Sequence, residues 1–435
     1  MSVISSISSG GSRRTRLLTV LDVGSSKISC IIARLRPLGQ TQYLPGRTHR
    51  MEVLGFGVQQ SRGVKSGMIV DLVAAEQAIR QTVDAAERMS GLVVDSVIVN
   101  FSCRGMKSEH VTAAVPVGEQ AVTIRDIRRV LSDGSRTAFH RDRPVVHSLP
   151  VSFSLDGEQD VADPQDMIGN ILGVDMHVVT ADTVPLRNLE HCINRAHLSV
   201  ERMVVTPLAS GLSVLVGDEA RLGAACIDFG GGTTTISVFS KGKFVFADSL
   251  AMGSHHITLD IARGLSISIE DAERLKVMHG SAFVCGSDDR HMITLPAQHG
   301  MSDGIARYPR GVLSRIIRAR AEEMLELVRD RLGRSGFGPA FGKRLIMTGG
   351  GSQLTGFPDV ARHILSSRLR VGRPLGISGL PDMARGAAFS TIVGLLIYPQ
   401  SAGFDDQKLY SVSAERLMKT EGRFLRMGRW LRESF

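Results

Sequence analysis

The segment Asp22-Val23-Gly24-Ser25-Ser26-Lys27 decides the fold of this chain. It joins two apolar runs, Leu17 to Val23 and Lys27 to Arg34, and therefore predicts a β-hairpin with a tip of small residues. Such a tip offers a polyphosphate several backbone N–H donors without bulky Cβ atoms, and Lys27 adds a positive charge. Asp22, at the end of the first strand, is suited to hold Mg²⁺ through water, because Mg²⁺ keeps much of its hydration shell. Taken alone, the segment is more often a tight turn capped by an aspartate.

The same arrangement returns 206 positions later as Asp228-Phe229-Gly230-Gly231-Gly232-Thr233-Thr234-Thr235. An apolar strand from Ala224 to Phe229 precedes the turn, and a second strand follows it as far as Ser240. Two hairpins that each carry an aspartate at the tip can face each other and hold a triphosphate and its metal from both sides. The pair is much more specific than either member, and it predicts two related lobes.

Two further segments suit a nucleoside. The glycines in Thr348-Gly349-Gly350-Gly351-Ser352 would let the backbone lie flat against a nucleoside, where side chains would clash. Glu273 and Lys276 lie three positions apart on a predicted helix and share a face, so the carboxylate can accept from ribose hydroxyls and the lysine stem can cover an adenine. Each segment also has a plainer interpretation. The glycines can form a flexible strand-to-helix loop, and Glu273 with Lys276 can be a surface ion pair.

The composition limits the class of protein. A chain of 435 residues with 43% hydrophobic and 22% charged residues is predicted to be globular and soluble, with at least two domains. Its five cysteines form no C-x-x-C pair, which argues against a zinc site and favours a reducing compartment. The net charge of +9 suits anionic lipid or an acidic partner, but no basic block is interleaved with aromatic residues, so no nucleic-acid partner is expected. No apolar run reaches the length of about 18 residues that a membrane-spanning helix needs.

Helices are predicted where apolar residues recur at helical spacing. The segment 71–89 has this spacing, and Gly91 stands where a helix stop is expected. Thr123 and Asp126 form a T-x-x-D pattern that is typical of a helix start. Further helices are expected over 269–279, 313–332 and 384–397.

The predicted domain organisation follows from these elements. We expect a disordered, basic and Ser-rich N-terminus over 1–16, a first-lobe core over 17–93 that continues at 174–206 and 380–398, and an inserted α/β subdomain over 94–173. A second lobe over 207–379, with its tip at about 253–317, is expected to precede a flexible linker over 399–421 and a terminal helix over 422–435.

This order of segments resembles the actin-like ATPases, and within that superfamily it is closest to the FtsA family of bacterial cell-division proteins. The resemblance extends from about Leu17 to the C-terminus. It implies an α/β, actin-like, two-lobed fold with duplicated mixed sheets that binds ATP and Mg²⁺, and it identifies 94–173 with the inserted subdomain peculiar to this family. The segments that carry it are Leu21-Asp22-Val23-Gly24-Ser25-Ser26-Lys27, Asp260-Ile261-Ala262, Asp271-Ala272-Glu273-Arg274-Leu275-Lys276, Thr348-Gly349-Gly350-Gly351 and Gly394-Leu395-Leu396.

The resemblance also implies partners and a location. Such a protein forms actin-like filaments on the cytoplasmic face of the inner membrane at the midcell septum, anchors the tubulin-like polymer FtsZ there and recruits later membrane proteins of the divisome. The tip of its second lobe holds the short, partly acidic C-terminal tail of FtsZ. Arginine forks suit carboxylates, although a charge run is usually only a solvated face. The candidate contacts in this chain are Arg307, Arg310, Arg315 and Arg318.

One departure concerns hydrolysis. Hydrolysing relatives in the superfamily carry a Glu or Gln on the connecting helix to orient the attacking water, whereas the segment 204–210 of this chain offers Thr206 and Pro207, which are poor general bases. We therefore expect nucleotide binding with slow hydrolysis or none, and we assign no catalytic residue.

The last fourteen residues predict an amphipathic helix that lies in a membrane interface. Apolar residues share one face and arginines lie opposite, as anionic headgroups require. The alternative is a helix packed on the body of the protein, but a long polar tether precedes this segment, and FtsA proteins end in such a targeting helix. The apolar residues are Phe424, Leu425, Met427, Trp430, Leu431 and Phe435, and the opposed arginines are Arg426 and Arg429.

Three other classes of protein share parts of this pattern. A sugar or acetate kinase would need an acid or base between the lobes, and the connecting segment has no candidate. A rod-shape filament or a pilus-assembly homologue would lack an insertion like 94–173 or would contact the membrane elsewhere. A chaperone ATPase would carry a long substrate domain, whereas only about 35 residues follow Tyr398. Deletion of 422–435 discriminates among them, since only the division protein should lose its membrane localisation.

Overall fold

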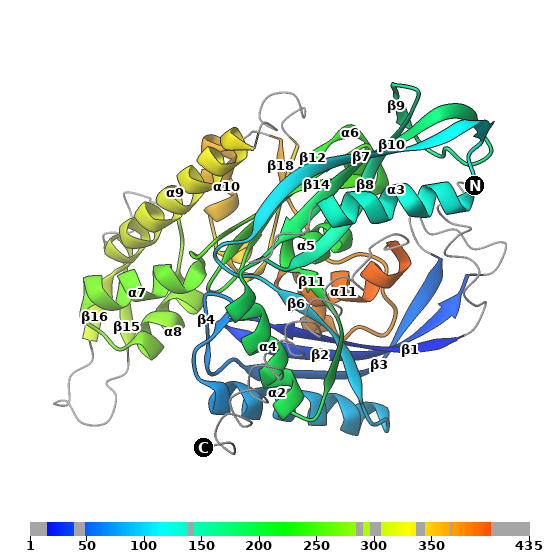
Figure 1. Cartoon of the computed structure of the whole chain (residues 1–435). Coiled ribbons are helices and arrows are strands. Elements are labelled where there is room, and N and C mark those ends of the chain that lie inside the picture. The colour runs from blue at the N-terminus through cyan, green and yellow to red at the C-terminus, as the bar shows by residue number, and fades with distance from the viewer. Residues whose placement is uncertain are drawn as a thin grey trace, which may run out of the picture. The chain divides into compact units, whose positions relative to one another are not determined.

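The structure, a computed structural model, describes residues 15–38, 48–137, 143–283, 290–295, 306–335, 344–365 and 368–401. The chain divides into two compact units (Figure 1). Within the described residues, the smaller unit is Lys107–Val184, and the larger unit comprises the chain up to Met106 and from Pro185 to Ser401. No helix in the described ranges is both long and apolar enough to cross a membrane.

The larger unit contains two five-stranded sheets with the same connectivity, β11-β6-β1-β2-β3 and β18-β17-β12-β13-β14. In each sheet the central strand pairs antiparallel with the next strand in sequence and parallel with a later one. The expected duplication is thereby confirmed. The first sheet consists of β1 (Arg16–Val23), β2 (Lys27–Pro37), β3 (His49–Gln60), β6 (Ser96–Phe101) and β11 (Ser199–Val205). The second consists of β12 (Ala224–Phe229), β13 (Thr234–Ser240), β14 (Lys243–Leu250), β17 (Leu345–Thr348) and β18 (Leu369–Val371).

The central hairpins are buried on both faces, which explains their nearly continuous apolar runs. Asp22 and Asp228 each occupy the last position but one of their strand, opposite Ser29 and Thr235 respectively. The duplicated topology therefore places both carboxylates at equivalent strand ends.

Two helices pack against each other between the sheets, α5 (Thr206–Val214) and α11 (Ser390–Ser401). Helix α5 contacts the second sheet and α11 the first. Gly394 permits their close approach, because a Cβ at this position would overlap the backbone of Ala209. Helix α2 (Leu72–Ser90) covers the opposite face of the first sheet at β2 and β3 (Figure 1). Helix α4 (Thr183–Arg195) precedes β11.

The far part of the second lobe is mainly helical. The long helix α9 (Arg310–Arg334) packs against α7 (Ser254–Leu265) and α10 (Phe357–Ile364). Arg320 on α9 forms two hydrogen bonds with the carboxylate of Asp260 on α7, one of them 3.1 Å long, and so fastens these two helices together. The remaining elements are α6 (Gly217–Leu222), α8 (Ile269–His279), β15 (Met292–Leu295) and β16 (Ala306–Pro309).

The smaller unit is a four-stranded sheet in the order β7-β10-β8-β9 with helix α3 (Ile124–Thr137) packed on one face. Val130, Phe153 and Leu172 are among the residues of its own apolar core. Helix α3 begins as the sequence predicts, because Thr123 and Asp126 bond reciprocally through their side chains and backbone N–H groups. The strands are β7 (Lys107–Ala121), β8 (Val145–Leu155), β9 (Glu158–Val161) and β10 (Ile168–Thr180).

Several local predictions are confirmed, and two boundaries differ. Helix α2 starts after an Asp71 N-cap and ends at Gly91 in the left-handed conformation, and α8 spans 269–279 as expected. The smaller unit starts at Lys107, later than the 94 predicted for the insertion, because β6 pairs with β1 in the first sheet. It ends later than 173 because β10 pairs with β7 and β8 as far as Thr180. The helix predicted over 384–397 is instead two 3-10 turns, η4 (Asp382–Arg385) and η5 (Ala387–Phe389), followed by α11, since the backbone at Gly386 is extended.

Candidate functional site

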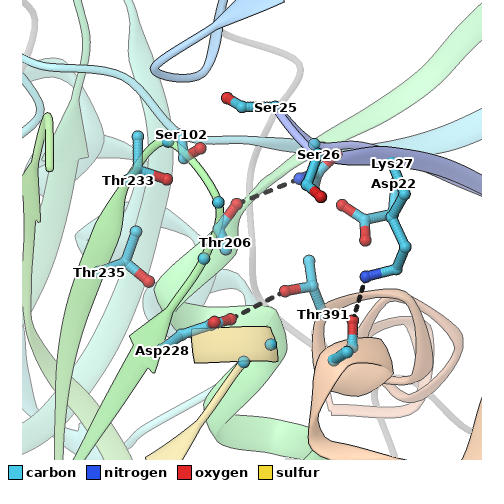
Figure 2. Close-up of a pocket in the computed structure, with 18 of the residues that line it drawn as sticks. Asp22, Ser25, Ser26, Lys27, Ser102, Thr206, Asp228, Thr233, Thr235 and Thr391 are labelled. Atoms are coloured by element: carbon cyan, nitrogen blue, oxygen red, sulfur yellow. Dashed lines mark hydrogen bonds between the residues drawn. The ribbon is translucent and has the colours of Figure 1, made fainter. Parts of the chain in front are cut away.

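A polar cavity lies where the two central hairpins meet (Figure 2). Figure 2 shows Asp22 and Lys27 on one side and Asp228 with Thr233 and Thr235 on the other. The structure therefore brings most of the predicted cofactor-binding residues together. Those that line the cavity are Asp22, Gly24, Ser25, Ser26, Lys27, Asp228, Gly230, Gly231, Gly232, Thr233, Gly349 and Gly350.

Both hairpin tips have the same backbone turn. The Gly24 N–H donates to Lys27 O at 3.1 Å, and the Gly230 N–H donates to Thr233 O at 2.9 Å. The two tips also touch each other, since a Cβ on Gly231 would stand 2.8 Å from Ser26 Cβ. Glycine at 230–232 thus allows a close contact between the lobes and keeps backbone groups, not side chains, at the cavity surface.

The two aspartates lie almost completely out of solvent, each with 6% exposure. Burial raises the pKa of Asp22 to about 6, an effect that the charge of Lys27 opposes and the nearby Asp228 adds to. Burial also raises the pKa of Asp228, against a hydrogen bond of 3.0 Å from the Thr391 hydroxyl. Two buried carboxylates in one cavity repel each other, and a cation between them would relieve this repulsion.

Lys27 reaches across the cavity to the segment that precedes α11. Its ammonium group donates to the Ala388 carbonyl oxygen and lies 4.5 Å from the centre of the Phe389 ring. The same segment accepts from the Gly349 N–H at Ala387 O, 3.1 Å away. Lys27 is therefore linked through η5 to the glycine loop that we predict to bind the nucleoside.

Sequence reasoning missed six polar residues of the cavity. Asn100, at the end of β6, accepts from the Val23 N–H at 2.7 Å and donates to the Thr206 hydroxyl at 3.3 Å, so it joins the first hairpin to the start of α5. Thr391 orients Asp228. A polar residue at the end of each sheet strand was the available signal, but it does not reveal which strands are neighbours. The missed residues are Asn100, Ser102, Thr206, Thr235, Ser254 and Thr391.

Thr235 provides the clearest sign that this cavity accepts a polar ligand. Its side chain is only 1% exposed and lines the cavity, yet its hydroxyl has no hydrogen-bond partner within the described residues. A buried hydroxyl without a partner costs about 1–3 kcal/mol, and a bound ligand would supply the missing bond.

Four predicted residues do not line the cavity. The Thr234 side chain faces the opposite side of β13 from its neighbours, and its hydroxyl donates to Met252 O at 2.7 Å. Gly351 is buried. Glu273 and Lys276 form a 2.6 Å ion pair on α8, and Lys276 also donates to the Thr258 hydroxyl at 2.8 Å and to Ser254 O at 3.3 Å. Since Ser254 lines the cavity, this pair lies next to it, and its contact with ribose or adenine stays a prediction.

The lining carries only two carboxylates among the described residues, Asp22 and Asp228. No group of three or more metal-ligating side chains occurs in the described ranges. This donor set fits Mg²⁺, which binds through one or two carboxylates, water and substrate phosphates. Helix α5 contributes Thr206 to the lining and no carboxylate, so it offers no general base.

Comparisons with known proteins identify the family of this chain. A family model described as cell division protein FtsA matches residues 225–394, and one described as the SHS2 domain inserted in FtsA matches 104–180. The protein named cell division protein FtsA from Rhizobium meliloti strain 1021 is 54% identical over 428 residues, 98% of this chain and 96% of that protein. Its counterpart from Pseudomonas aeruginosa is 30% identical over 97% of this chain and 98% of that protein. This chain belongs to the FtsA family.

The fold of this FtsA-family chain is actin-like. A structure of the PilM-PilN type IV pilus biogenesis complex contains a chain with a TM-score of 0.59 at 15% identity, covering 88% of this chain and 98% of that one. That likeness concerns the fold alone. The SHS2 match coincides with the smaller unit, whose sheet and helix α3 lie within Lys107–Val184.

Other predicted contact residues of this FtsA-family chain lie away from the cavity or outside the described residues. Arg307 lies on β16 and Arg310, Arg315 and Arg318 on α9, and the Arg318 guanidinium pairs with Glu322 at 2.8 Å. The N-terminal residues 1–14 and the linker from 402 to 421 lie outside the described residues. The same holds for the residues predicted to contact the membrane, which are Phe424, Leu425, Arg426, Met427, Arg429, Trp430, Leu431 and Phe435.

Proposed function

We propose that this FtsA-family protein binds ATP with Mg²⁺, polymerises on the cytoplasmic face of the inner membrane and anchors FtsZ there during cell division. The observation that carries the nucleotide part is the meeting of two hairpins, with Asp22 and Asp228 at equivalent positions, around a cavity that contains the unpartnered hydroxyl of Thr235. Membership of a cell-division family supports the cellular role.

Different parts of the cavity suit different parts of a nucleoside triphosphate. Backbone N–H groups of the two tips would face the phosphates, and the glycines at 349–350 would lie against the nucleoside. The two aspartates would hold hydrated Mg²⁺, whose charge neutralises the phosphate oxygens. This binding would also offset the cost of ionising two buried carboxylates.

Slow hydrolysis or none is part of this proposal. A water molecule that attacks the terminal phosphate needs a group to orient it and accept its proton. At the start of α5 the cavity offers the Thr206 hydroxyl, which already donates to Phe101 O at 3.3 Å and accepts from Asn100. Nucleotide therefore acts here mainly as a structural ligand between the lobes.

Membrane attachment is assigned to the terminal segment 422–435. Full burial of one large apolar side chain contributes about 1.5–3 kcal/mol, but insertion at an interface is partial and must also order the tether. One helix should consequently bind weakly and reversibly, whereas a filament of many subunits binds tightly through multivalency. Polymerisation and membrane binding then reinforce each other, and a variant locked as a monomer that bound liposomes as tightly as the polymer would contradict this coupling.

The FtsZ tail is assigned to the tip of the second lobe. Arg307, Arg310 and Arg315 are exposed there, on β16 and the first turns of α9. Their charge suits a partly acidic peptide. Later membrane proteins of the divisome would join the assembly at the septum once the filament is anchored.

Co-sedimentation with anionic liposomes tests the proposal, with and without ATP and Mg²⁺. We expect the wild-type protein to pellet with lipid, more completely when ATP is present, and Trp430→Glu to stay in solution because a charge cannot enter the apolar boundary. Trp430→Phe is the matched control, since it keeps an aromatic apolar side chain and should still pellet. If wild type and both variants all remained soluble, the terminal segment would not be the anchor.

A further inference from the structure

A strained turn stands beside the hairpin tips. Strands β4 (Val64–Lys65) and β5 (Met68–Ile69) are joined by Ser66 and Gly67, both in the left-handed region with φ of 48° and 76°. A serine in this conformation carries a steric cost that surrounding structure must offset, and such positions concentrate at functional sites. At Gly67 no other residue fits, because a Cβ would overlap the carbonyl oxygen of Ser102, a residue of the cavity wall.

This turn contacts both phosphate-facing tips. The Gly67 N–H donates to the Ser25 hydroxyl at 3.1 Å. On the other side, a Cβ on Gly232 would stand 2.9 Å from Ser66 N and 2.5 Å from Ser25 Oγ. Three backbone turns thus converge at one place, two from the first lobe and one from the second.

One backbone N–H group and one ammonium group of this segment have no partner within the described residues. The Ser66 N–H makes no hydrogen bond there, although it lies directly against Gly232. Lys65 is exposed and forms no ion pair in the described part of the chain. A free N–H beside a free ammonium group, next to glycine tips, is an arrangement that binds oxyanions.

The charge of Lys65 also acts on a group of the second lobe. His255, whose N–H donates to Gly231 O at 2.8 Å, lies close enough for the charge of Lys65 to affect it. Burial lowers the pKa of His255 most, and the charge of Lys276 lowers it further. Glu273 raises this pKa, and Lys65 lowers it by a smaller amount. An anion placed between the two lobes at this point would be attracted by the charge of Lys65.

The position of the turn indicates which phosphate it would meet. The glycine loop assigned to the nucleoside packs against Asp228, since a Cβ on Gly349 would overlap Oδ1 of that carboxylate, and Thr391 bonds the same carboxylate. Ser25 and Gly232 belong to the tips, and Figure 2 shows Ser25 at the opposite end of the cavity from Thr391. A nucleotide with its base at the loop would direct its last phosphate toward the tips and the Ser66–Gly67 turn.

We propose that the segment Lys65–Gly67 is a third phosphate-contacting element, in which the Lys65 ammonium group and the Ser66 N–H bind the terminal phosphate of a nucleoside triphosphate. This inference rests on the proposed nucleotide binding and adds a specificity determinant to it. A diphosphate would leave both groups without a partner. The segment therefore distinguishes triphosphate from diphosphate, and it transmits the difference to the contact between the lobes.

The test compares dissociation constants of a non-hydrolysable ATP analogue and of ADP, both with Mg²⁺, by calorimetry on the full-length protein. We expect Lys65→Gln to weaken binding of the ATP analogue about tenfold, as expected for loss of a charge-assisted bond, and to change ADP binding less than about twofold. Lys65→Arg should keep the wild-type ratio of the two constants, because it keeps the charge. Lys107→Gln, the same charge change at an exposed position of the smaller unit, is the control and should leave both constants unchanged.

The outcomes separate the two proposals. If the wild-type protein bound neither nucleotide, the proposed nucleotide function itself would fail. If it bound both, and Lys65→Gln left the ratio of the two dissociation constants at the wild-type value, only the role of the Lys65–Gly67 segment would be overturned. Equal weakening of both nucleotides by Lys65→Gln would also overturn it, since a general electrostatic contribution does not discriminate.

Discussion

Replacing Asp22 by Asn should stabilise the protein without nucleotide and weaken its binding of Mg·ATP. The substitution preserves size and shape but removes a carboxylate that is 6% exposed and has an ordinary pKa of 3.8 raised by burial to about 6. Since Asn cannot ionise, the variant avoids the cost of holding a buried negative charge. It also loses one of the two carboxylates assigned to hydrated Mg²⁺.

The sign and size of the effect follow from linkage between protonation and folding. Between pH 3.8 and about 6 the folded state of the wild type binds more protons at Asp22 than the unfolded state does, so its stability falls as the pH rises through this window. Each pKa unit corresponds to 1.36 kcal/mol, so the full loss is about 3 kcal/mol above the folded pKa. The advantage of Asp22→Asn should therefore grow from about 1–2 kcal/mol at pH 5 to about 3 kcal/mol at pH 7.5.

Thermal unfolding at these two pH values measures this difference. One kcal/mol shifts the melting temperature by about 2–4 °C in domains of 150–250 residues, so the variant should melt several degrees above the wild type at pH 7.5 and by less at pH 5. Asp84→Asn, an exposed position on α2, controls for the loss of a charge in general. With saturating Mg·ATP the order should reverse, because the wild type gains more stability from the ligand.

The reasoning is refuted if the melting difference between Asp22→Asn and wild type is the same at pH 5 and pH 7.5, or if the variant melts lower at both. A difference that depends on pH but persists unchanged in Mg·ATP would instead show that Asp22 is buried without contacting the metal. For the wild type, we also expect affinity for Mg·ATP to decline as the pH falls below about 6, where Asp22 becomes protonated.

Two further substitutions test neighbouring parts of the site. Gly349→Ala should weaken nucleotide binding and lower the free energy of unfolding by about 1–3 kcal/mol, because Gly349 has a φ of 83° and a Cβ would meet Phe229 O at 2.5 Å. Thermal unfolding measures the stability and calorimetry measures the binding. If both matched the wild type, the close approach of this loop would be contradicted. Thr391→Val keeps the side-chain shape but removes the hydroxyl that donates to Asp228 at 3.0 Å, and should raise the pKa of that carboxylate further. Its Mg·ATP affinity should then drop more at pH 6 than at pH 8, and a loss of equal size at both pH values, measured by calorimetry, would exclude this explanation.

Local structure was largely predictable because it depends on neighbours in the chain. Asp71 and Gly91 cap α2 as their side-chain chemistry and conformational freedom predict, and both Asp-tipped hairpins form where apolar runs meet a turn of small residues. The repeated segment also predicted two related lobes, which the identical strand orders confirm.

Long-range pairing was the part that sequence patterns could not supply. Strand β6 belongs to the first sheet because it pairs with β1, where Val20 lies opposite Ile98, 78 positions later. No local signal separates this strand from the insertion that follows. Asn100, at the end of that strand, was missed for the same reason. Alternation along β13 predicts that Thr234 and Thr235 face opposite ways, but only the packing shows that Thr235 faces the cavity.

The sequence by itself determined the two hairpins, the glycine loop, the helix ends and the family to which the chain is similar, since each depends on residues close together in the chain. Only the tertiary structure decided that Asp22 and Asp228 share one buried cavity, that Thr391 and Asn100 orient its walls, and that the Ser66–Gly67 turn meets both tips. The physical reason is that burial, and with it the raised pKa of Asp22, arises from atoms contributed by strands and helices hundreds of residues apart.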